Sequence, residues 1–450
     1  MERIKENSPS ILLFPWLGFG HVNPFLALAK KLSKMNFHIY FLSTPIILKS
    51  IKETLDKNST NYNQSIQLVE FHLPYLHELP PHYHTTKDLP PHLNSTLIQA
   101  FQMASSKFPS IIETLKPNLI IYDGFQPWVA TMASSYSIHA IMFYVSSTSG
   151  LAYIYHQFLH GSSSLTSFPF SSIYLHDHEI KKLGIQPIKP RDEKAFAYII
   201  LESFEQSHNI VLLNTCREIE GKYIDYVSTI GKKELIPIGP LIREAMIDEE
   251  EDWGTIQSWL DKKDQLSCVY VSFGSESFLS KQEIEEIAKG LELSKVNFIW
   301  TIKFPKGVNK TIEEMVPQGF LESTKGKGMV IEGWAPQSLI LNHSSIGGFI
   351  THCGWNSILE SMSFGIPIIA MPMNHDQPLN SRLVEELGIG VEILRGENGK
   401  IMKEEVAKGI RKVIEEKPRK QIHLKAMQLS EKIKLKAIDE GVKKLLKLLY

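Results

Sequence analysis

Short apolar runs recur along this chain of 450 residues, and helical segments separate them. Many of the runs are rich in Ile, Val and Leu, as in Leu119–Tyr122, which is typical of strands buried on both faces of a parallel sheet. The runs form two series, one on each side of an acidic stretch at 244–252. Because the chain is also longer than one hydrophobic core usually serves, the sequence predicts an α/β protein with two doubly wound, parallel-sheet domains.

The predicted strands and the acidic stretch place the domain boundaries. Strands of the first series are expected at 10–15, 37–42, 66–73, 119–122, 140–145 and 210–213. Strands of the second series are expected at 268–273, 297–302, 329–331, 348–351 and 367–371. The Pro- and His-rich segment 74–91 fits neither a regular helix nor a central strand, so we interpret it as a long loop at the functional edge. We predict an N-terminal domain over 1–240, a linker over 241–253 and a second domain over 254–437.

Charge and cysteine content exclude several classes of protein. The net charge of -1 and the isoelectric point near 7.0 argue against binding nucleic acid or an acidic membrane through bulk electrostatics. The three cysteines show neither a disulfide framework nor a zinc-binding spacing, so a reducing compartment is expected. No apolar run approaches the roughly 18 residues of a membrane span, and no signal peptide is evident. We expect a cytoplasmic protein, and nothing requires an assembly larger than a monomer.

A glycine-containing turn from Gly18 to His21 joins the first predicted strand to a helix predicted at 21–35. A dinucleotide-binding fingerprint would continue with a third glycine and would place an acid at the end of the second strand. The chain has Asn23 and Ser43-Thr44 at these places. Binding of NAD or FAD is therefore excluded, and the glycines are explained by a tight turn that allows close approach to the backbone.

His21 and Asp123 are the candidate catalytic residues. His21 begins a helix at the edge where α/β sheets place ligands, and a histidine is suited to taking a proton from a hydroxyl at neutral pH. Asp123 follows the strand predicted at 119–122, so it is expected at the same edge, where its carboxylate could fix the tautomer of the imidazole. The alternatives are a helix-start histidine without chemistry and an aspartate that only caps a helix.

A second group of potential ligands opens the helix predicted at 355–364. A helix N-terminus presents backbone N–H groups and a partial positive charge, which suit a diphosphate. The residues expected there are His352, Gly354, Asn356 and Ser357. Glu360, further along the same helix, is placed to accept hydrogen bonds from a ribose diol. Taken alone, Asn356 or Ser357 as a helix cap is the simpler interpretation.

Three further signals are weak when each is taken alone. Trp334 follows a predicted strand, and its indole could stack on a base, although an isolated Trp is more often part of a core. Asp376 and Gln377 follow another strand and offer hydrogen bonds to sugar hydroxyls. Ser275, in a Ser-Phe-Gly-Ser turn, could add a hydroxyl to the phosphates, but such turns are common.

Together these residues resemble the signature box of the plant secondary-metabolite UDP-glycosyltransferases (family 1, GT-B), and the stretch from Trp334 to Gln377 has the length of that box. The resemblance extends to the turn before His21 and to the strand that ends before Asp123. It implies two Rossmann-like domains that face each other across a cleft, with the acceptor bound mainly by the first and the UDP-sugar by the second. It also implies that a C-terminal helix at 438–450 packs back on the N-terminal domain.

The resemblance assigns a role to each candidate residue. His21 and Asp123 would be the catalytic pair. The predicted UDP-glucose contacts are Trp334 and Ala335 for uracil, Gln337 and Glu360 for ribose, His352, Asn356 and Ser357 for the phosphates, with Gly354 in the same turn and Ser275 as an addition, and Trp355, Asp376 and Gln377 for the sugar. Gln377 at the end of the box is similar to members that use glucose. No metal or other cofactor is expected, and no Asp-x-Asp metal motif occurs where phosphates would bind.

Four segments look like the branch of the family that extends a sugar already attached to a natural product: FPWLGFGHVNPFLALAKKLS, LPPHYHTTKDLPPHL, YDGFQPW and SFGSE. The resemblance implies an inverting, UDP-glucose-dependent glucosyltransferase that adds β-glucose to a sugar hydroxyl of a flavonoid or terpenoid glucoside. A 1→6 linkage is favoured, and 1→2 is the alternative. Other interpretations are direct transfer to an aglycone, a UDP-sugar epimerase or hydrolase, and a non-catalytic UDP-sugar binder.

Overall fold

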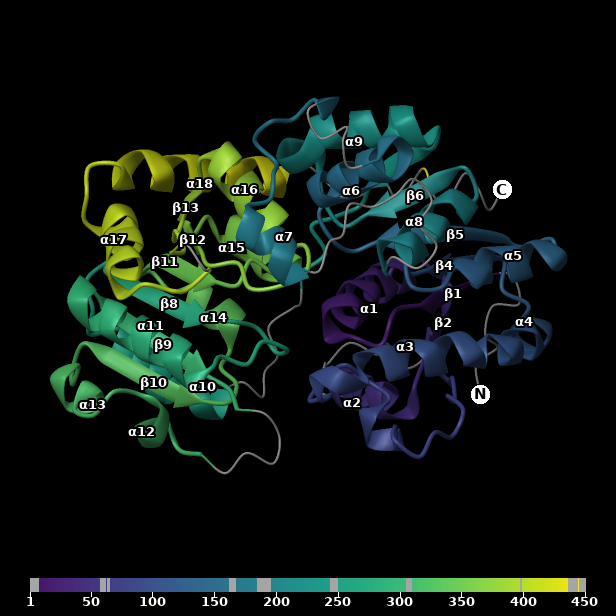
Figure 1. The fold of residues 1–450 in the computed structure, drawn as a ribbon. Coiled ribbons are helices and arrows are strands. Elements are labelled where there is room, and N and C mark those ends of the chain that lie inside the picture. Colours follow the sequence, from purple (N-terminus) through teal and green to yellow (C-terminus); the bar gives the residue numbers. More distant parts are fainter. Residues whose placement is uncertain are drawn as a thin grey trace. The chain divides into compact units, whose positions relative to one another are not determined.

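The computed structural model describes residues 8–56, 62, 65–161, 167–183, 196–242, 250–304, 310–396, 399–435 and 444. These residues form two compact units. Unit 1 contains the described residues before 162, those of 196–242 and Lys444, whereas unit 2 contains those of 167–183 and 250–435. Each unit is built on one parallel sheet (Figure 1). The predicted pair of α/β domains is confirmed.

The sheet of unit 1 has seven strands in the order β3-β2-β1-β4-β5-β6-β7, and all neighbours are parallel. They are β1 (Ser10–Phe14), β2 (His38–Ser43), β3 (Ile66–Glu70), β4 (Leu119–Tyr122), β5 (His139–Tyr144), β6 (Ile210–Leu213) and β7 (Glu234–Pro237). Every run predicted as a strand in this half forms one. β7 is not among the predicted strands, because its sequence Glu-Leu-Ile-Pro holds too short an aliphatic run to be recognised.

Helices connect these strands. In the described part of unit 1 they are α1 (Phe19–Ser33), α2 (Pro45–Asp56), α3 (Asn94–Met103), α4 (Phe108–Leu115), α5 (Pro127–Ser135), α6 (Thr148–His160), α8 (Phe196–Gln206) and α9 (Arg217–Gly231). The segment 74–91, predicted as a loop, holds an isolated bridge between Leu76 and Leu79 and a short 3-10 turn at Pro81–Tyr83.

The sheet of unit 2 has six parallel strands in the order β10-β9-β8-β11-β12-β13. They are β8 (Cys268–Ser272), β9 (Asn297–Ile302), β10 (Gly328–Glu332), β11 (Ile346–Thr351), β12 (Ile368–Ala370) and β13 (Gly390–Glu392). The described helices are α7 (Asp177–Leu183), α10 (Glu250–Leu260), α11 (Lys281–Ser294), α12 (Ile312–Met315), α13 (Phe320–Ser323), α14 (Gln337–Leu341), α15 (Trp355–Phe364), α16 (Gln377–Leu387), α17 (Lys403–Ile414) and α18 (Arg419–Leu435). β13 is absent from the predicted strands, because three residues that include a glycine give no strand pattern.

Two hydrophobic cores cover the two faces of the sheet in unit 2. Along β8, Val269 and Val271 belong to the core that includes residues of α11 and α17. Cys268 and Tyr270 belong to the core that includes residues of α10 and α14. Successive residues of a strand point to opposite faces, so this alternation is the one expected for a sheet with helices on both sides.

Both sheets reverse their strand order beside their first strand, between β1 and β4 in unit 1 and between β8 and β11 in unit 2. In open α/β sheets, ligands bind outside the carboxyl ends of the strands at such a switch point. His21 and Asp123 follow β1 and β4, whereas Gly274 and His352 follow β8 and β11. The predicted catalytic pair and the predicted phosphate turn therefore occupy equivalent places in the two units.

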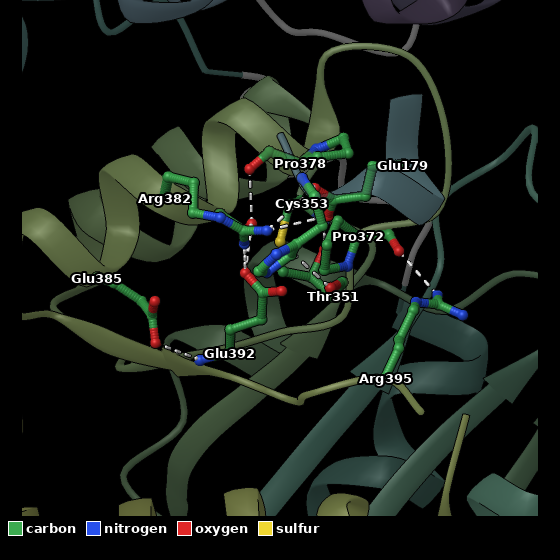
Figure 2. A network of polar contacts seen from close by, with 11 residues as sticks. Glu179, Thr351, Cys353, Pro372, Pro378, Arg382, Glu385, Glu392 and Arg395 are labelled. Carbon is green, nitrogen blue, oxygen red and sulfur yellow. Dashed lines mark hydrogen bonds and ion pairs between the residues drawn. The ribbon is translucent and has the colours of Figure 1, made fainter. Parts of the chain in front are cut away.

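The observed boundaries differ from the predicted ones at the segment 167–183 and at the end of the linker. Residues 167–183 precede α8 of unit 1 in the sequence, yet they belong to unit 2. A buried ion pair between Glu179 and Arg382 fastens this segment to α16 (Figure 2). Of the predicted linker 241–253, residues 243–249 lie outside the described residues, and α10 already begins at Glu250.

The C-terminal helix predicted at 438–450 lies outside the described residues except for Lys444, whose Nζ is 2.7 Å from Glu234 of unit 1. Among the described helices, none is both long and apolar enough to cross a bilayer. The three cysteines are buried free thiols. Burial raises the pKa of Cys268 to about 11 and that of Cys216 to about 12, so both remain protonated and unreactive at neutral pH.

Candidate active site

His21 and Asp123 form a close pair in unit 1. The Nδ1 atom of His21 lies 2.8 Å from Oδ2 of Asp123. The His21 side chain is 28% exposed, whereas that of Asp123 is 3% exposed. In the tautomer in which Nδ1–H donates to Asp123, the lone pair is on Nε2, and that atom can accept a proton. The fold brings together the two residues that the sequence places at separate strand ends.

Backbone groups and one amide hold Asp123 in place. The backbone N–H of Trp16 donates to Oδ2 of Asp123 at 3.3 Å, and the N–H of Asp123 donates to Oε1 of Gln126 at 2.9 Å. Nε2 of Gln126 in turn donates to the carbonyl of Phe14 at 3.1 Å. The N-cap of α5 is Gln126, so the interpretation of Asp123 as only a helix cap is wrong.

Aromatic rings fix the orientation of the His21 imidazole. Phe125 packs against it with ring centroids 5.4 Å apart at an interplanar angle of 79°, and Trp16 stacks on Phe125 at 4.6 Å. Such pairs limit the rotation of the rings that they contain. Trp16, Phe125 and Gln126 were not identified from the sequence as site residues, and only the resemblance of the FPWLGFG and YDGFQPW segments could have pointed to them.

A cavity of about 480 Å³ lies in unit 1 beside the segment 72–84, and its size is typical of sites for small molecules. Its wall combines imidazole, phenol and aliphatic groups from Pro45, Ile46, Lys49, His72, Leu73, Tyr75, Leu79, Pro81, His82 and His84. Directly after this segment, Thr85 Oγ1 and the N–H of Thr86 donate to the carbonyl of Leu17 at 3.0 and 3.1 Å. The cavity wall is thereby joined to the backbone that leads into the turn before His21.

In unit 2, two glycines enclose the ring of His352. A Cβ atom at Gly274 would lie 2.6 Å from Cε1 of the ring, and one at Gly354 would lie 2.5 Å from Nε2. Gly274 also has a φ of +76°, a conformation that favours glycine. Burial lowers the pKa of His352 to about 4. The imidazole is therefore neutral at pH 7 and has one ring N–H that can donate to a phosphate oxygen.

The predicted phosphate turn leads into α15. Gly354 is the N-cap of this helix, so Asn356 and Ser357 stand in its first turn. The side chain of Trp355 is buried. A helix of ten residues carries the positive end of its dipole at this turn, which suits an anion.

The predicted ribose residues meet between α14 and α15. Nε2 of Gln337 donates to Oε2 of Glu360 at 2.6 Å and lies 3.4 Å from Oγ of Ser357. The hydroxyl of Ser338 donates to the other carboxylate oxygen of Glu360. Sequence analysis did not identify Ser338, although it is the residue next to Gln337. Two hydrogen-bond donors of α14 thus fix the orientation of the Glu360 carboxylate. A binding residue needs such support to hold a ligand in a defined geometry.

The predicted sugar residues open α16, with Asp376 as its N-cap and Gln377 as its first residue. Oε1 of Gln377 accepts from the backbone N–H groups of Met373 and Asn374 at 3.0 and 2.7 Å, which leaves the amide NH₂ to donate to a sugar oxygen. Nδ2 of Asn380 donates both to Oδ2 of Asp376 and to the carbonyl of Cys353, each at 3.0 Å. Asn380, which was not identified from the sequence, therefore links the sugar pair to the phosphate turn.

The remaining candidates differ in accessibility. Trp334 is 44% exposed, which suits a stacking surface better than a place in the core. Ala335 is buried in the core beside α14, so only its backbone can reach a ligand. Ser275 is exposed in the turn after β8.

Comparison with known families covers both halves of the chain. Residues 255–442 match the family described as UDP-glucoronosyl and UDP-glucosyl transferase, and residues 7–243 match the family described as glycosyltransferase, N-terminal domain. The chain is 48% identical to a mogroside IIIx synthase of Siraitia grosvenorii, over 98% of this chain and 97% of the relative. It is 45% identical to a beta-D-glucosyl crocetin beta-1,6-glucosyltransferase of Gardenia jasminoides, over 95% of this chain and 96% of the relative.

The fold has a close match among solved structures. Glycyrrhiza uralensis UGT73P12 complexed with glycyrrhetinic acid 3-O-monoglucuronide matches with a TM-score of 0.86 over 98% of this chain and 96% of that chain. The sequences are 23% identical, so this likeness establishes the fold, which is of the GT-B type. Because family profiles match both halves and nearly half of all residues are identical in long relatives, the chain belongs to the UDP-glucoronosyl and UDP-glucosyl transferase family and is a UDP-glycosyltransferase.

Proposed function

We propose that the protein transfers glucose from UDP-glucose to a hydroxyl of a sugar already attached to a natural product, such as a flavonoid or terpenoid glucoside. A 1→6 linkage is favoured over 1→2. The observation that carries this proposal is the similarity, over almost the whole chain, to the Gardenia relative, whose name specifies a glucosyl acceptor and a β-1,6 linkage. The similarity includes the first half, where loops shape the acceptor pocket.

The geometry of unit 2 supports a nucleotide sugar as donor. The Gln337–Glu360 pair suits a ribose diol, and the neutral His352 ring at the start of α15 suits a diphosphate. The amide NH₂ of Gln377 suits a sugar hydroxyl, since the carbonyl oxygen of that side chain already accepts two backbone N–H groups. The indole of Trp334 offers an accessible face for uracil.

In the proposed reaction, the acceptor oxygen forms a bond to C1 of glucose while the bond from C1 to the β-phosphate oxygen breaks. The hydroxyl proton passes to Nε2 of His21, and Asp123 stabilises the imidazolium that results. The electron pair of the broken bond leaves with UDP, whose charge is stabilised by the His352 N–H and the start of α15. Attack from the face opposite UDP converts the α-linked donor into a β-glucoside.

The test offers purified protein UDP-glucose together with a flavonol, its 3-O-glucoside or a terpenoid monoglucoside, and measures product mass and linkage. We expect glucose to be added to the glucosides, with the new bond at the 6-hydroxyl. Preference for the bare flavonol would contradict the assignment and favour an aglycone transferase. Release of glucose without any acceptor would favour a hydrolase, and a His21→Ala preparation serves as the control for contaminating activity.

A further inference from the structure

Arg382 is a buried cation on α16, the helix that opens with the predicted sugar residues. Its side chain is 2% exposed. Nη2 donates to both carboxylate oxygens of Glu179, at 3.0 and 3.1 Å, and Nη1 donates to Oγ of Ser381 at 2.9 Å and pairs with Glu392. Figure 2 shows the guanidinium between the two carboxylates. A buried guanidinium is stable only when carboxylates and other acceptors compensate its charge, so these contacts restrict the orientation of Arg382.

The position of α16 determines the geometry of the donor site. Asp376 is its N-cap and Gln377 its first residue, and Asn380 ties the helix to the carbonyl of Cys353 in the phosphate turn. At the other end of the loop that precedes α16, Nη2 of Arg395 donates to the carbonyl of Pro372 at 2.8 Å (Figure 2). A rotation or shift of α16 would therefore move the sugar pair directly.

Glu179 is itself held rigidly. Its Oε2 accepts the backbone N–H of His176 at 2.7 Å, just before α7 begins, and its side chain is 7% exposed. Tyr174 belongs to the same segment as Glu179, and the guanidinium carbon of Arg382 lies 4.8 Å from the centroid of its ring. The segment 167–183 thus presents a fixed carboxylate and an aromatic face to α16, although it comes from the first half of the sequence.

We propose that Glu179 is a positioning residue of the sugar half of the donor site. It acts through Arg382, whose orientation sets the place of Asp376 and Gln377. This inference rests on the proposed function only in the identity of the sugar, since the same geometry would serve any UDP-hexose. It assigns to the segment 167–183 a role in binding the donor.

The test uses Glu179→Gln. Glu392 still neutralises Arg382 in this variant, so no uncompensated buried charge remains and the protein is expected to fold. Calorimetry measures the Kd of UDP and of UDP-glucose for wild type and variant. We expect the Kd of UDP-glucose to rise about tenfold, with the Kd of UDP changed by less than about twofold. The reason is that the sugar pair stands on α16 itself, whereas the predicted uridine and phosphate contacts lie at α14, at α15 and in the turn after β8.

A matched control is Ser172→Ala. Ser172 fastens the same segment to α16 through Glu386 but does not touch Arg382, so both Kd values are expected to stay at the wild-type level. Glu179→Asp, which keeps the charge, is expected to recover part of the lost affinity. Equal losses for UDP and UDP-glucose, or no loss for either, would overturn the proposal by showing that Glu179 supports only the stability of the unit.

These binding measurements need no acceptor, so their outcome is distinct from that of the proposed function. A wild type that binds UDP-glucose and transfers nothing to any glucoside would contradict the proposed acceptor class and leave the role of Glu179 to be decided by the ratio of the two Kd values. If Glu179→Gln does not fold, Arg382→Lys provides the second variant, with the same expected loss for UDP-glucose alone.

Discussion

The Nδ1 atom of His21 lies 2.8 Å from Oδ2 of Asp123, although 102 positions separate the two residues in the sequence. The two residues follow neighbouring strands at the switch point of the first sheet. The contact fixes which imidazole nitrogen carries the proton, and so determines which one can act as a base.

His21→Ala removes the proposed base. General-base catalysis is typically worth about 10²–10⁴ in rate, so we expect kcat to fall by about that factor. The Kd of UDP should stay unchanged, because the predicted UDP contacts all belong to unit 2. Steady-state kinetics and calorimetry check the two expectations, and a variant as active as the wild type would contradict the assignment.

Asp123→Asn keeps the size of the side chain and removes its charge. Because the backbone N–H of Trp16 donates to the same oxygen that His21 contacts, the amide oxygen keeps that place. A neutral amide no longer stabilises the imidazolium that forms when His21 takes the proton. We expect kcat to fall by about 10²–10⁴, with the thermal midpoint of unfolding little changed. The decisive comparison is the double variant with His21→Ala, which should be no slower than His21→Ala alone if the pair acts as one unit.

Gly274→Ala places a methyl group against the ring of His352. We expect the ring to shift and the Kd of UDP to rise about tenfold, because the imidazole N–H that would donate a hydrogen bond to the diphosphate is displaced. Gly319→Ala is the matched control, since Gly319 has a similar φ of +80° but open space around it. In both variants the free energy of unfolding should fall by about 1 kcal/mol, because alanine disfavours a positive φ. Only Gly274→Ala should also lose affinity for UDP.

The low pKa of His352 makes the stability of the ligand-free protein depend on pH. The pKa is about 4 in the folded state against 6.5 for the ordinary side chain, so the unfolded chain binds the proton first as pH falls. Stability is therefore full above pH 6.5 and is lost between pH 6.5 and 4. At pH 5 the loss from this residue should reach about 2 kcal/mol. Urea unfolding at pH 7 and 5 should show it in the wild type, and His352→Gln should lack this part of the pH dependence.

Trp334→Ala tests the stacking surface. Since Trp334 is 44% exposed, we expect the thermal midpoint to change little. The Kd of UDP should rise by about tenfold, because stacking of a base on an aromatic ring is worth about 1–3 kcal/mol. Trp300→Ala is the contrasting case, because that side chain is fully buried and its loss should lower stability by about 3–5 kcal/mol. An unchanged affinity in Trp334→Ala would refute the assignment to uracil.

The strands were predictable because central strands of a parallel sheet are buried on both faces and must be apolar throughout. Leu119–Tyr122, Ile210–Leu213 and Asn297–Ile302 begin and end at the predicted residues. The strands that were not predicted, β7 and β13, are the last in their sheets, where a short run with Pro or Gly is sufficient. The edge strands at the opposite ends of the two sheets, β3 and β10, were predicted because each contains a longer run with Ile, Val, Leu or Met.

The residues expected to contact the ligands could be predicted from the sequence, whereas the residues that hold them in place could not. Gln337 and Glu360 were recognised as a pair, and the structure joins them. Asn380 and Gln126 escaped recognition, because each acts by a hydrogen bond to the backbone of a residue distant in sequence. The turn after β8 was interpreted through the hydroxyl of Ser275, but the structure shows that Gly274, which has no side chain, is the residue that fits against His352. The sequence alone does not show which ring or backbone a glycine will lie against, so the partner of Gly274 could not be predicted.

The Glu179–Arg382 pair joins positions 203 residues apart, and it places a segment from the first half of the sequence in the second unit. It has a consequence for protein engineering. A chimera that exchanges acceptor halves between two relatives by recombination near residue 240 would import the segment 167–183 together with the foreign acceptor half. The transplanted segment would then face an α16 that evolved with a different partner. Hybrids of this kind should recover donor affinity when the crossover also carries residues 167–183 from the parent that supplies Arg382.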